Sequence, residues 1–125
     1  MILDTNALSA IADGAREVAS ALNQAKLVAI PVIVLGEYRF GIAQSRRSGD
    51  YEGWLAANLS ACRILDITEK TAIAYARIRS DLKMAGTPIP ANDAWIAALC
   101  RQHALPLLSR EQHFDLVKSI RRISW

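Results

Sequence analysis

Short apolar runs alternate with longer amphipathic segments along this chain. The runs are short enough to be buried strands. They lie at Met1–Asp4, Leu27–Ile30, Arg63–Ile67 and Pro106–Ser109, and Arg122–Trp125 predicts a further strand at the edge of the sheet. The longer segments carry apolar residues at helical spacing. They predict helices from about Thr5 to Ala25 with an interruption near Asp13-Gly14, and at Pro31–Ser45, Tyr51–Ser60, Thr68–Gly86 and Asn92–His103.

This alternation predicts an α/β fold with three layers, in which helices cover both faces of a mostly parallel sheet. Helix boundaries are marked by Pro31 in a first turn, by Thr68 as a cap and by Gly86 as a stop signal. An all-helical bundle fits less well, because the runs at Leu27 and Pro106 are too short for helices. The chain shows no repeat or linker, so we expect residues 1–125 to form one domain.

Composition supports a folded globular chain. Hydrophobic residues make up 52% of the 125 residues and charged residues 22%, which argues against disorder. No positively charged segment leads into an apolar stretch at the start, and no apolar run approaches the roughly 18 residues of a membrane span. We therefore expect a cytoplasmic protein without a membrane partner. Cys62 and Cys100 lie far apart without a second pair, which predicts two reduced thiols rather than a zinc site.

The first polar residues follow the first apolar run at once, in the sequence LDTN. Asp4 lies where a strand passes into a helix, and Asp, Thr and Asn all favour the N-cap of a helix. A carboxylate at this place has a second interpretation, because open α/β sheets bind ligands just beyond the carboxyl ends of their strands. Asp4 alone does not distinguish a cap from a ligand.

Two further acids fall on apolar helix faces. Glu37 has Ile33, Phe40 and Gly41 one turn away, and residues three or four apart share a face. Asp93 lies in a first helical turn, which favours an anion, and it precedes an apolar stripe formed by Ile96, Ala97 and Cys100. Each acid taken singly could be structural, through a salt bridge for Glu37 or a helix start for Asp93.

Three carboxylates turned inward or placed at a strand end are harder to explain separately. Clustered carboxylates repel one another unless a cation lies between them, and oxygen ligands suit Mg²⁺ or Mn²⁺. The sequence therefore predicts a metal pocket formed by Asp4, Glu37 and Asp93.

At this point the chain resembles the PIN-domain family. The resemblance is carried by Leu3-Asp4-Thr5-Asn6, the helical Glu37, Asn92–Ala98 and Leu107-Leu108-Ser109, in the family's order along the whole chain. It is closest to the VapC-like toxins of type II toxin–antitoxin pairs. The resemblance implies a compact α/β/α fold and a metal-dependent ribonuclease that uses Mg²⁺ or Mn²⁺. It also implies a cognate antitoxin as partner and a homodimer.

The family's acids carry over onto Asp4, Glu37 and Asp93, which the resemblance assigns as catalytic and metal-binding residues. Thr5 and Asn6 match positions that support the first acid, and Ser109 matches a hydroxyl at the end of the last core strand. The chain departs from the family in its short first strand and in its fourth acid. That acid follows Ser109 directly in relatives, whereas the candidates here are Glu111 and Asp115. We predict Glu111, since it lies nearer the strand end.

The net charge of the chain favours an RNA substrate only when the proposed metal-binding acids are left out of the count. The net charge is +3, from 15 basic and 12 acidic residues, and removing four site acids leaves 15 basic against eight acidic residues. Candidate phosphate contacts are Arg39, Arg46, Arg47 and Arg110. His113 lies close enough in sequence to touch substrate, while Trp54 and Trp95 have the spacing of core residues.

Two other functions remain open from the sequence. A haloacid-dehalogenase-like phosphatase would use Asp4 as a nucleophile, but that family needs a second Asp at the position of Asn6. A catalytically silent PIN-like module would only bind RNA or protein. The silent module has no use for mutually repelling carboxylates, so their retention favours the enzyme.

Overall fold

The computed structural model describes all residues 1–125, and its centre is a parallel five-stranded sheet. The strands follow the spatial order β3-β2-β1-β4-β5. Every neighbouring pair is parallel, and Leu3 of β1 lies opposite Leu108 of β4. The predicted α/β fold is confirmed, and the all-helical alternative is wrong. The strands are β1 (Ile2–Leu3), β2 (Ala29–Pro31), β3 (Arg63–Leu65), β4 (Leu107–Leu108) and β5 (Arg122–Ile123).

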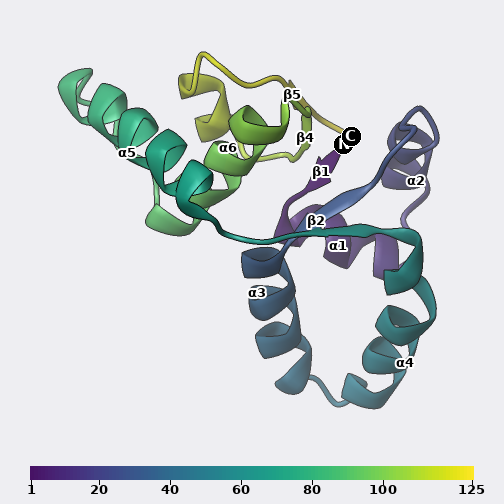
Figure 1. Cartoon of the computed structure of the whole chain (residues 1–125). Coiled ribbons are helices and arrows are strands. Elements are labelled where there is room, and N and C mark those ends of the chain that lie inside the picture. Colours follow the sequence, from purple (N-terminus) through teal and green to yellow (C-terminus); the bar gives the residue numbers. More distant parts are fainter.

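Helices complete a three-layer α/β/α arrangement around this sheet. Figure 1 shows α5 and α6 together on one side of the molecule, while α3 and α4 extend from the other. The α-helices are α1 (Thr5–Ala12), α2 (Arg16–Leu22), α3 (Val32–Ala43), α4 (Ser48–Asn58), α5 (Glu69–Met84) and α6 (Ala91–His103); short 3₁₀ helices are η1 (Leu59–Ala61) and η2 (Gln112–Leu116).

Some predicted boundaries shift by a few residues. The second strand begins at Ala29 rather than Leu27, because Leu27 is exposed and lies before the paired segment. Pro31 ends this strand and α3 begins at Val32, so Pro31 is an N-cap residue and not part of the first helical turn. Helix α4 begins at Ser48, three residues before the predicted start at Tyr51. The interruption predicted near Asp13-Gly14 separates α1 from α2.

The two central strands are buried on both faces, as in other parallel sheets covered by helices. Ile2, Leu3, Leu107 and Leu108 are at most 2% exposed. Because β1 and β4 are parallel neighbours, the residues that follow them emerge at the same edge of the sheet. This places Asp4 and Ser109, both buried, next to each other.

Local signals define the ends of the long helix α5. Thr68 is its N-cap and forms a capping box with Thr71. Gly86 has φ of +72°, the left-handed conformation that suits glycine beyond a helix C-terminus. No helix in the structure combines the length and apolarity needed to cross a membrane.

Candidate active site

Asp4 lies at the point where β1 passes into α1. Its Oδ1 atom accepts a hydrogen bond from the Ala7 main-chain N–H at 2.8 Å, so Asp4 caps α1 as the sequence predicted. Only 4% of the residue is exposed. Its second oxygen therefore faces a largely closed environment at the carboxyl edge of the sheet.

The surroundings of Asp4 disfavour its charged form. Burial raises the pKa of Asp4, and hydrogen bonds from Ser109 and the Ala7 main chain oppose that increase. The negative charges of Asp93 and Glu111 raise the pKa further. A cation near Asp4 would relieve both the repulsion and the cost of burial.

Asp93 comes from the first turn of α6, opposite the end of β1. The stripe that follows it is buried as predicted, with Ile96, Ala97 and Cys100 at most 2% exposed. The Oδ2 atom of Asp93 lies 2.8 Å from Nε2 of His113. Burial raises the pKa of Asp93, the His113 side chain lowers it, and Glu111 raises it. The net direction is upward, as for Asp4.

Glu37 reaches the same edge from α3 and is held by two neutral donors. Its Oε2 atom accepts from the Thr5 hydroxyl at 3.3 Å, and its Oε1 atom accepts from the Asn92 amide at 3.0 Å. The predicted inward face of α3 is wrong in part, since Phe40 is 71% exposed. The residues of α3 that reach the core are instead Val34, Tyr38 and Ile42.

Glu111 joins this group and Asp115 does not. The Asn6 amide donates to Glu111 at 3.2 Å, and a second carboxylate oxygen of Glu111 lies 3.9 Å from His113. Asp115 is instead bound by both oxygens to Arg122, at 2.8 and 2.7 Å, and this bonding lowers the pKa of Asp115. The structure thus brings Asp93 and Glu111 near Asp4, and Glu37 reaches the same edge through its bonds to Thr5 and Asn92, the neighbours of Asp4 and Asp93 in sequence.

None of these four acids is paired with a lysine or arginine. Neutral hydrogen-bond donors from Thr5, Asn6 and Asn92, together with His113, lie around them instead. Sequence reasoning missed the contacts of Asn92 and His113 with the acids. The signal was their position, because Asn92 directly precedes Asp93 and His113 follows Glu111 by two residues.

The donor set suits a hard divalent cation. All four acids supply oxygen, and the buried hydroxyl of Ser109 lies beside Asp4. No three acidic, imidazole or thiol groups converge in this arrangement closely enough to form a complete metal cluster. The residues fit Mg²⁺ or Mn²⁺ by their oxygen donors and by the buried position of Asp4, where neighbouring negative charges disfavour the ionised carboxylate. Mg²⁺ commonly retains several water ligands, so it does not require a complete set of protein ligands.

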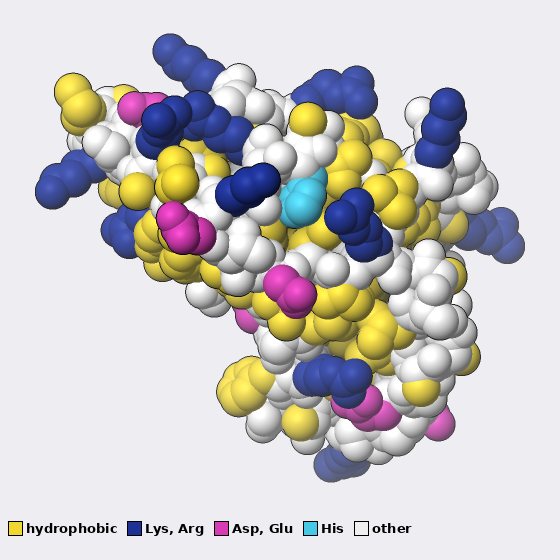
Figure 2. All heavy atoms as spheres, in the orientation of Figure 1, with side chains coloured by type: hydrophobic (Ala, Val, Ile, Leu, Met, Phe, Trp, Pro, Cys, Tyr) yellow, Lys and Arg dark blue, Asp and Glu magenta, His cyan; other side chains and the backbone are white.

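The four candidate RNA-binding arginines have different surroundings. Arg39 pairs with Glu52 at 2.6 Å, and Arg47 lies 3.5 Å from Asp50. Arg46 has no ionic partner, and Arg110 donates to the main-chain oxygen of Trp125 at 2.9 Å. Figure 2 shows that basic side chains outnumber acidic ones on the face seen in the orientation of Figure 1.

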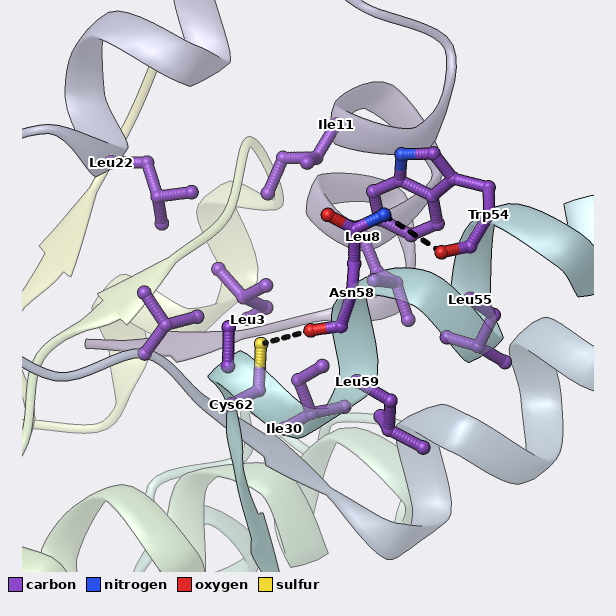
Figure 3. A pocket seen from close by; sticks show the side chains of 12 residues that line it. Leu3, Leu8, Ile11, Leu22, Ile30, Trp54, Leu55, Asn58, Leu59 and Cys62 are labelled. Atoms are coloured by element: carbon purple, nitrogen blue, oxygen red, sulfur yellow. Dashed lines mark hydrogen bonds between the residues drawn. The ribbon is translucent and has the colours of Figure 1, made fainter.

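The structure also contains an apolar hollow of about 180 Å³ beside α1, and none of the four acids lines it. Figure 3 shows Leu8, Ile11, Trp54 and Cys62 among the side chains that line it. Eleven of its 12 lining residues are hydrophobic. Its one ionisable group is the Cys62 thiol, and burial raises the pKa of that thiol, so the acidic edge is the candidate active site.

Comparisons with known proteins identify the family to which this chain belongs. A family model for the PIN domain matches residues 1–119. Ribonuclease VapC5 from Mycobacterium tuberculosis is 30% identical over 115 residues, which cover 90% of this chain and 84% of that protein.

Two solved structures have the same fold. VapBC2 from Rickettsia felis, solved with a DNA fragment from its promoter, superimposes with a TM-score of 0.89 at 23% identity, covering 99% of this chain and 97% of that one. FitAcB from Neisseria gonorrhoeae superimposes with a TM-score of 0.78 at 28% identity, covering 98% and 95%. The protein described here therefore belongs to the PIN-domain family and groups with its VapC members.

Proposed function

We propose that residues 1–125 act as one metal-dependent ribonuclease domain that hydrolyses RNA phosphodiesters. One observation carries the proposal most directly: four carboxylates share one edge of the sheet, and none of them has a lysine or arginine partner. The chain contains 15 basic residues, so the absence of such pairs is not a lack of cations. A bound divalent cation would supply the missing positive charge.

The four acids have different proposed roles, according to how deeply each is buried and how far its side chain extends. Asp4 and Asp93 would hold Mg²⁺ or Mn²⁺ directly, and Glu37 would bind it through water or orient the attacking water. When bound, the cation lowers the pKa of water and offsets negative charge on the phosphate. Glu111 would contact the cation through a water molecule and adjust the metal affinity without being essential for cleavage. Thr5, Asn6 and Ser109 hold these acids in place through the hydrogen bonds described above.

Arginines around the acidic edge contact the RNA backbone. Arg46 and Arg110 are the most available for phosphate contacts, because neither is paired with a carboxylate side chain. Arg39 and Arg47 must loosen their contacts with Glu52 and Asp50 to bind phosphate. Such ion pairs are weak at the surface, at about 0–1 kcal/mol, so RNA can compete with them.

We further propose that the protein is the toxin of a toxin–antitoxin pair and acts in the cytoplasm as a homodimer. One relative carries the name Toxin FitB, and the solved relatives include a toxin–antitoxin complex from Klebsiella pneumoniae and VapBC-5 from Mycobacterium tuberculosis, a member of a family of toxin–antitoxin systems. The antitoxin covers the acidic edge, and an arginine from it reaches the unpaired carboxylates. That contact replaces the cation and blocks RNA.

The proposal is tested by incubating purified protein with RNA, with Mg²⁺ or Mn²⁺ and with EDTA as control. Wild-type protein should cleave only with the metal. Asp4→Asn and Asp93→Asn should abolish cleavage while keeping the native circular dichroism spectrum. Equal cleavage in EDTA would overturn the metal dependence, and a folded wild type that never cleaves RNA would identify a silent module.

A further inference from the structure

The outer face of α1 lies between two clefts that both border the acidic edge. The first cleft, between α1, α3 and α4, has a volume of about 290 Å³ and includes Glu37 and Tyr51 in its wall. The second, of about 720 Å³, includes Glu111 and Trp125. Both clefts are lined by Asn6 and Ser9 of α1, so they adjoin along this helix.

Each cleft has one aromatic side chain covered by an arginine. The guanidinium carbon of Arg47 lies 5.4 Å from the centre of the Tyr51 ring, and that of Arg110 lies 4.8 Å from the centre of the Trp125 ring. Further bonds fix both pairs. The Tyr51 hydroxyl donates to Asp13 at 2.8 Å, and Arg110 donates to the main-chain oxygen of Trp125.

The two arginine–aromatic pairs have the chemistry of a single-strand nucleic-acid binding surface. Bases of an unpaired strand stack on aromatic rings or on guanidinium planes, and arginine also contacts the phosphates between them. Both rings are only half-buried, so they are within reach of a ligand. Asp13 and Glu17 also line the second cleft, and their negative charges repel phosphate. We therefore expect the RNA backbone to lie on the side of this cleft that carries Arg110.

We propose that single-stranded RNA crosses α1, with the scissile phosphate at the four acids and the flanking nucleotides on Tyr51–Arg47 and Trp125–Arg110. This inference rests on the proposed ribonuclease function. It adds the residues that position the nucleotides on either side of the scissile phosphate. A duplex does not fit the proposal, because paired and stacked bases do not present their faces to the two rings.

A third arginine–aromatic pair provides a matched control. The Arg79 guanidinium lies 5.6 Å from the ring centre of Tyr75 on α5, and neither residue lines the two clefts. The three aromatic residues Tyr51, Trp125 and Tyr75 can therefore each be changed to leucine and the variants compared. Any general effect of losing such a pair should occur in all three variants.

The experiment measures binding of a fluorescein-labelled, 12-nucleotide single-stranded RNA and of its duplex, in the non-cleaving Asp93→Asn protein. Tyr51→Leu and Trp125→Leu should each weaken single-strand binding about tenfold, and Tyr75→Leu should change it less than about twofold. Tyr51→Phe retains the ring and should bind like the parent. The duplex should bind more weakly than the single strand.

Arginine variants keep the proposal testable if a leucine variant does not fold. Arg47→Gln and Arg110→Gln should each lower the slope of log affinity against log salt by about 0.7, and Arg79→Gln should not. Equal losses at all three aromatic positions, or duplex binding as tight as single-strand binding, would overturn the inference. Cleavage of the same single-stranded RNA by wild-type protein, measured in parallel, separates that failure from failure of the ribonuclease proposal.

Discussion

At the scale of single residues, Asp4 has two roles that the same carboxylate makes compatible. One oxygen caps α1, while the buried group also belongs to the acidic edge. Asparagine caps a helix as well as aspartate does, but it carries no charge. Substitutions at this position can therefore separate the cap from the charge.

We expect Asp4→Asn to melt at the same temperature as wild type or higher in EDTA, because the repulsion from Asp93 and Glu111 disappears. Asp4→Ala also loses the cap and should be about 1 kcal/mol less stable than Asp4→Asn. Thermal unfolding with and without Mg²⁺ or Mn²⁺ measures both effects. The metal should raise the melting temperature of wild type alone. A metal-induced increase in both variants would contradict the role of Asp4 as ligand.

The two candidates for the fourth acid are distinguished by their present partners. Glu111→Gln should slow RNA cleavage and weaken metal affinity, since Glu111 lies with the other acids. Asp115→Asn should leave cleavage unchanged and lower the free energy of unfolding only slightly, because the Asp115 carboxylate that pairs with Arg122 is exposed to solvent. Cleavage rates and metal titrations of the two variants decide the assignment. Normal cleavage by Glu111→Gln with loss in Asp115→Asn would reverse it.

Cys100 predicts a specific dependence on alkaline pH. Burial raises the pKa of its thiol to about 12, from 9.0 when unperturbed. The unfolded chain therefore releases this proton first, so Cys100 lowers the free energy of unfolding as the pH rises from 9 toward 12, by up to about 1.4 kcal/mol per pH unit. Denaturant titrations of wild type and Cys100→Ala across this range should show a steeper decline for wild type. Parallel declines would show that Cys100 does not contribute.

At the scale of elements, two glycines contribute differently to stability, because one follows a helix and the other lies inside one. Gly86 lies beyond α5 with φ of +72°, whereas Gly53 lies inside α4, where an added Cβ would meet no atom within 4 Å. Gly86→Ala should destabilise the protein by about 1–2 kcal/mol. Gly53→Ala should stabilise it by about 0.5–1 kcal/mol, because alanine has the lower conformational entropy cost in a helix. Chemical denaturation compares the two, and stabilisation by Gly86→Ala would contradict the assigned helix end.

Helix starts also determine where the site lies. The first turns of α1 and α6 bring Asp4 and Asp93 toward the same sheet edge. Glu37 comes from the middle of α3 and reaches that edge through Thr5 and Asn92. The site thus depends on the packing of three helices, and changes at their contacts should affect activity without touching an acid.

At the scale of the whole molecule, the toxin proposal predicts a phenotype. Expression of wild-type protein alone should arrest bacterial growth, because uncontrolled RNA cleavage stops protein synthesis. Asp93→Asn should be harmless at the same protein level, and co-expression of the small partner should restore growth with wild type. Growth curves with immunoblots measure this. Normal growth with soluble, active wild-type protein would contradict the toxin role but not the nuclease.

The sequence by itself determined the class of fold, and it predicted which acids form the proposed site. Apolar runs too short for helices predicted the strands, because a buried strand needs only a few residues. The motif around Asp4 and the acid at the start of α6 rest on local chemistry, since helix caps and first turns are local structures. The resemblance to the PIN-domain family rested on the same residues, and it is confirmed.

Only the tertiary structure decided which side chains meet. Phe40 is exposed although spacing placed it with Glu37, because the face of α3 that reaches the core is set by the helices packed against it. Glu111 and Asp115 are four residues apart in sequence, and their different partners follow from the turn after β4 and from the position of Arg122 on β5. The contact of His113 with Asp93 joins the last part of the chain to α6. Such contacts depend on how elements distant in sequence pack together, and no local pattern of residues encodes that packing.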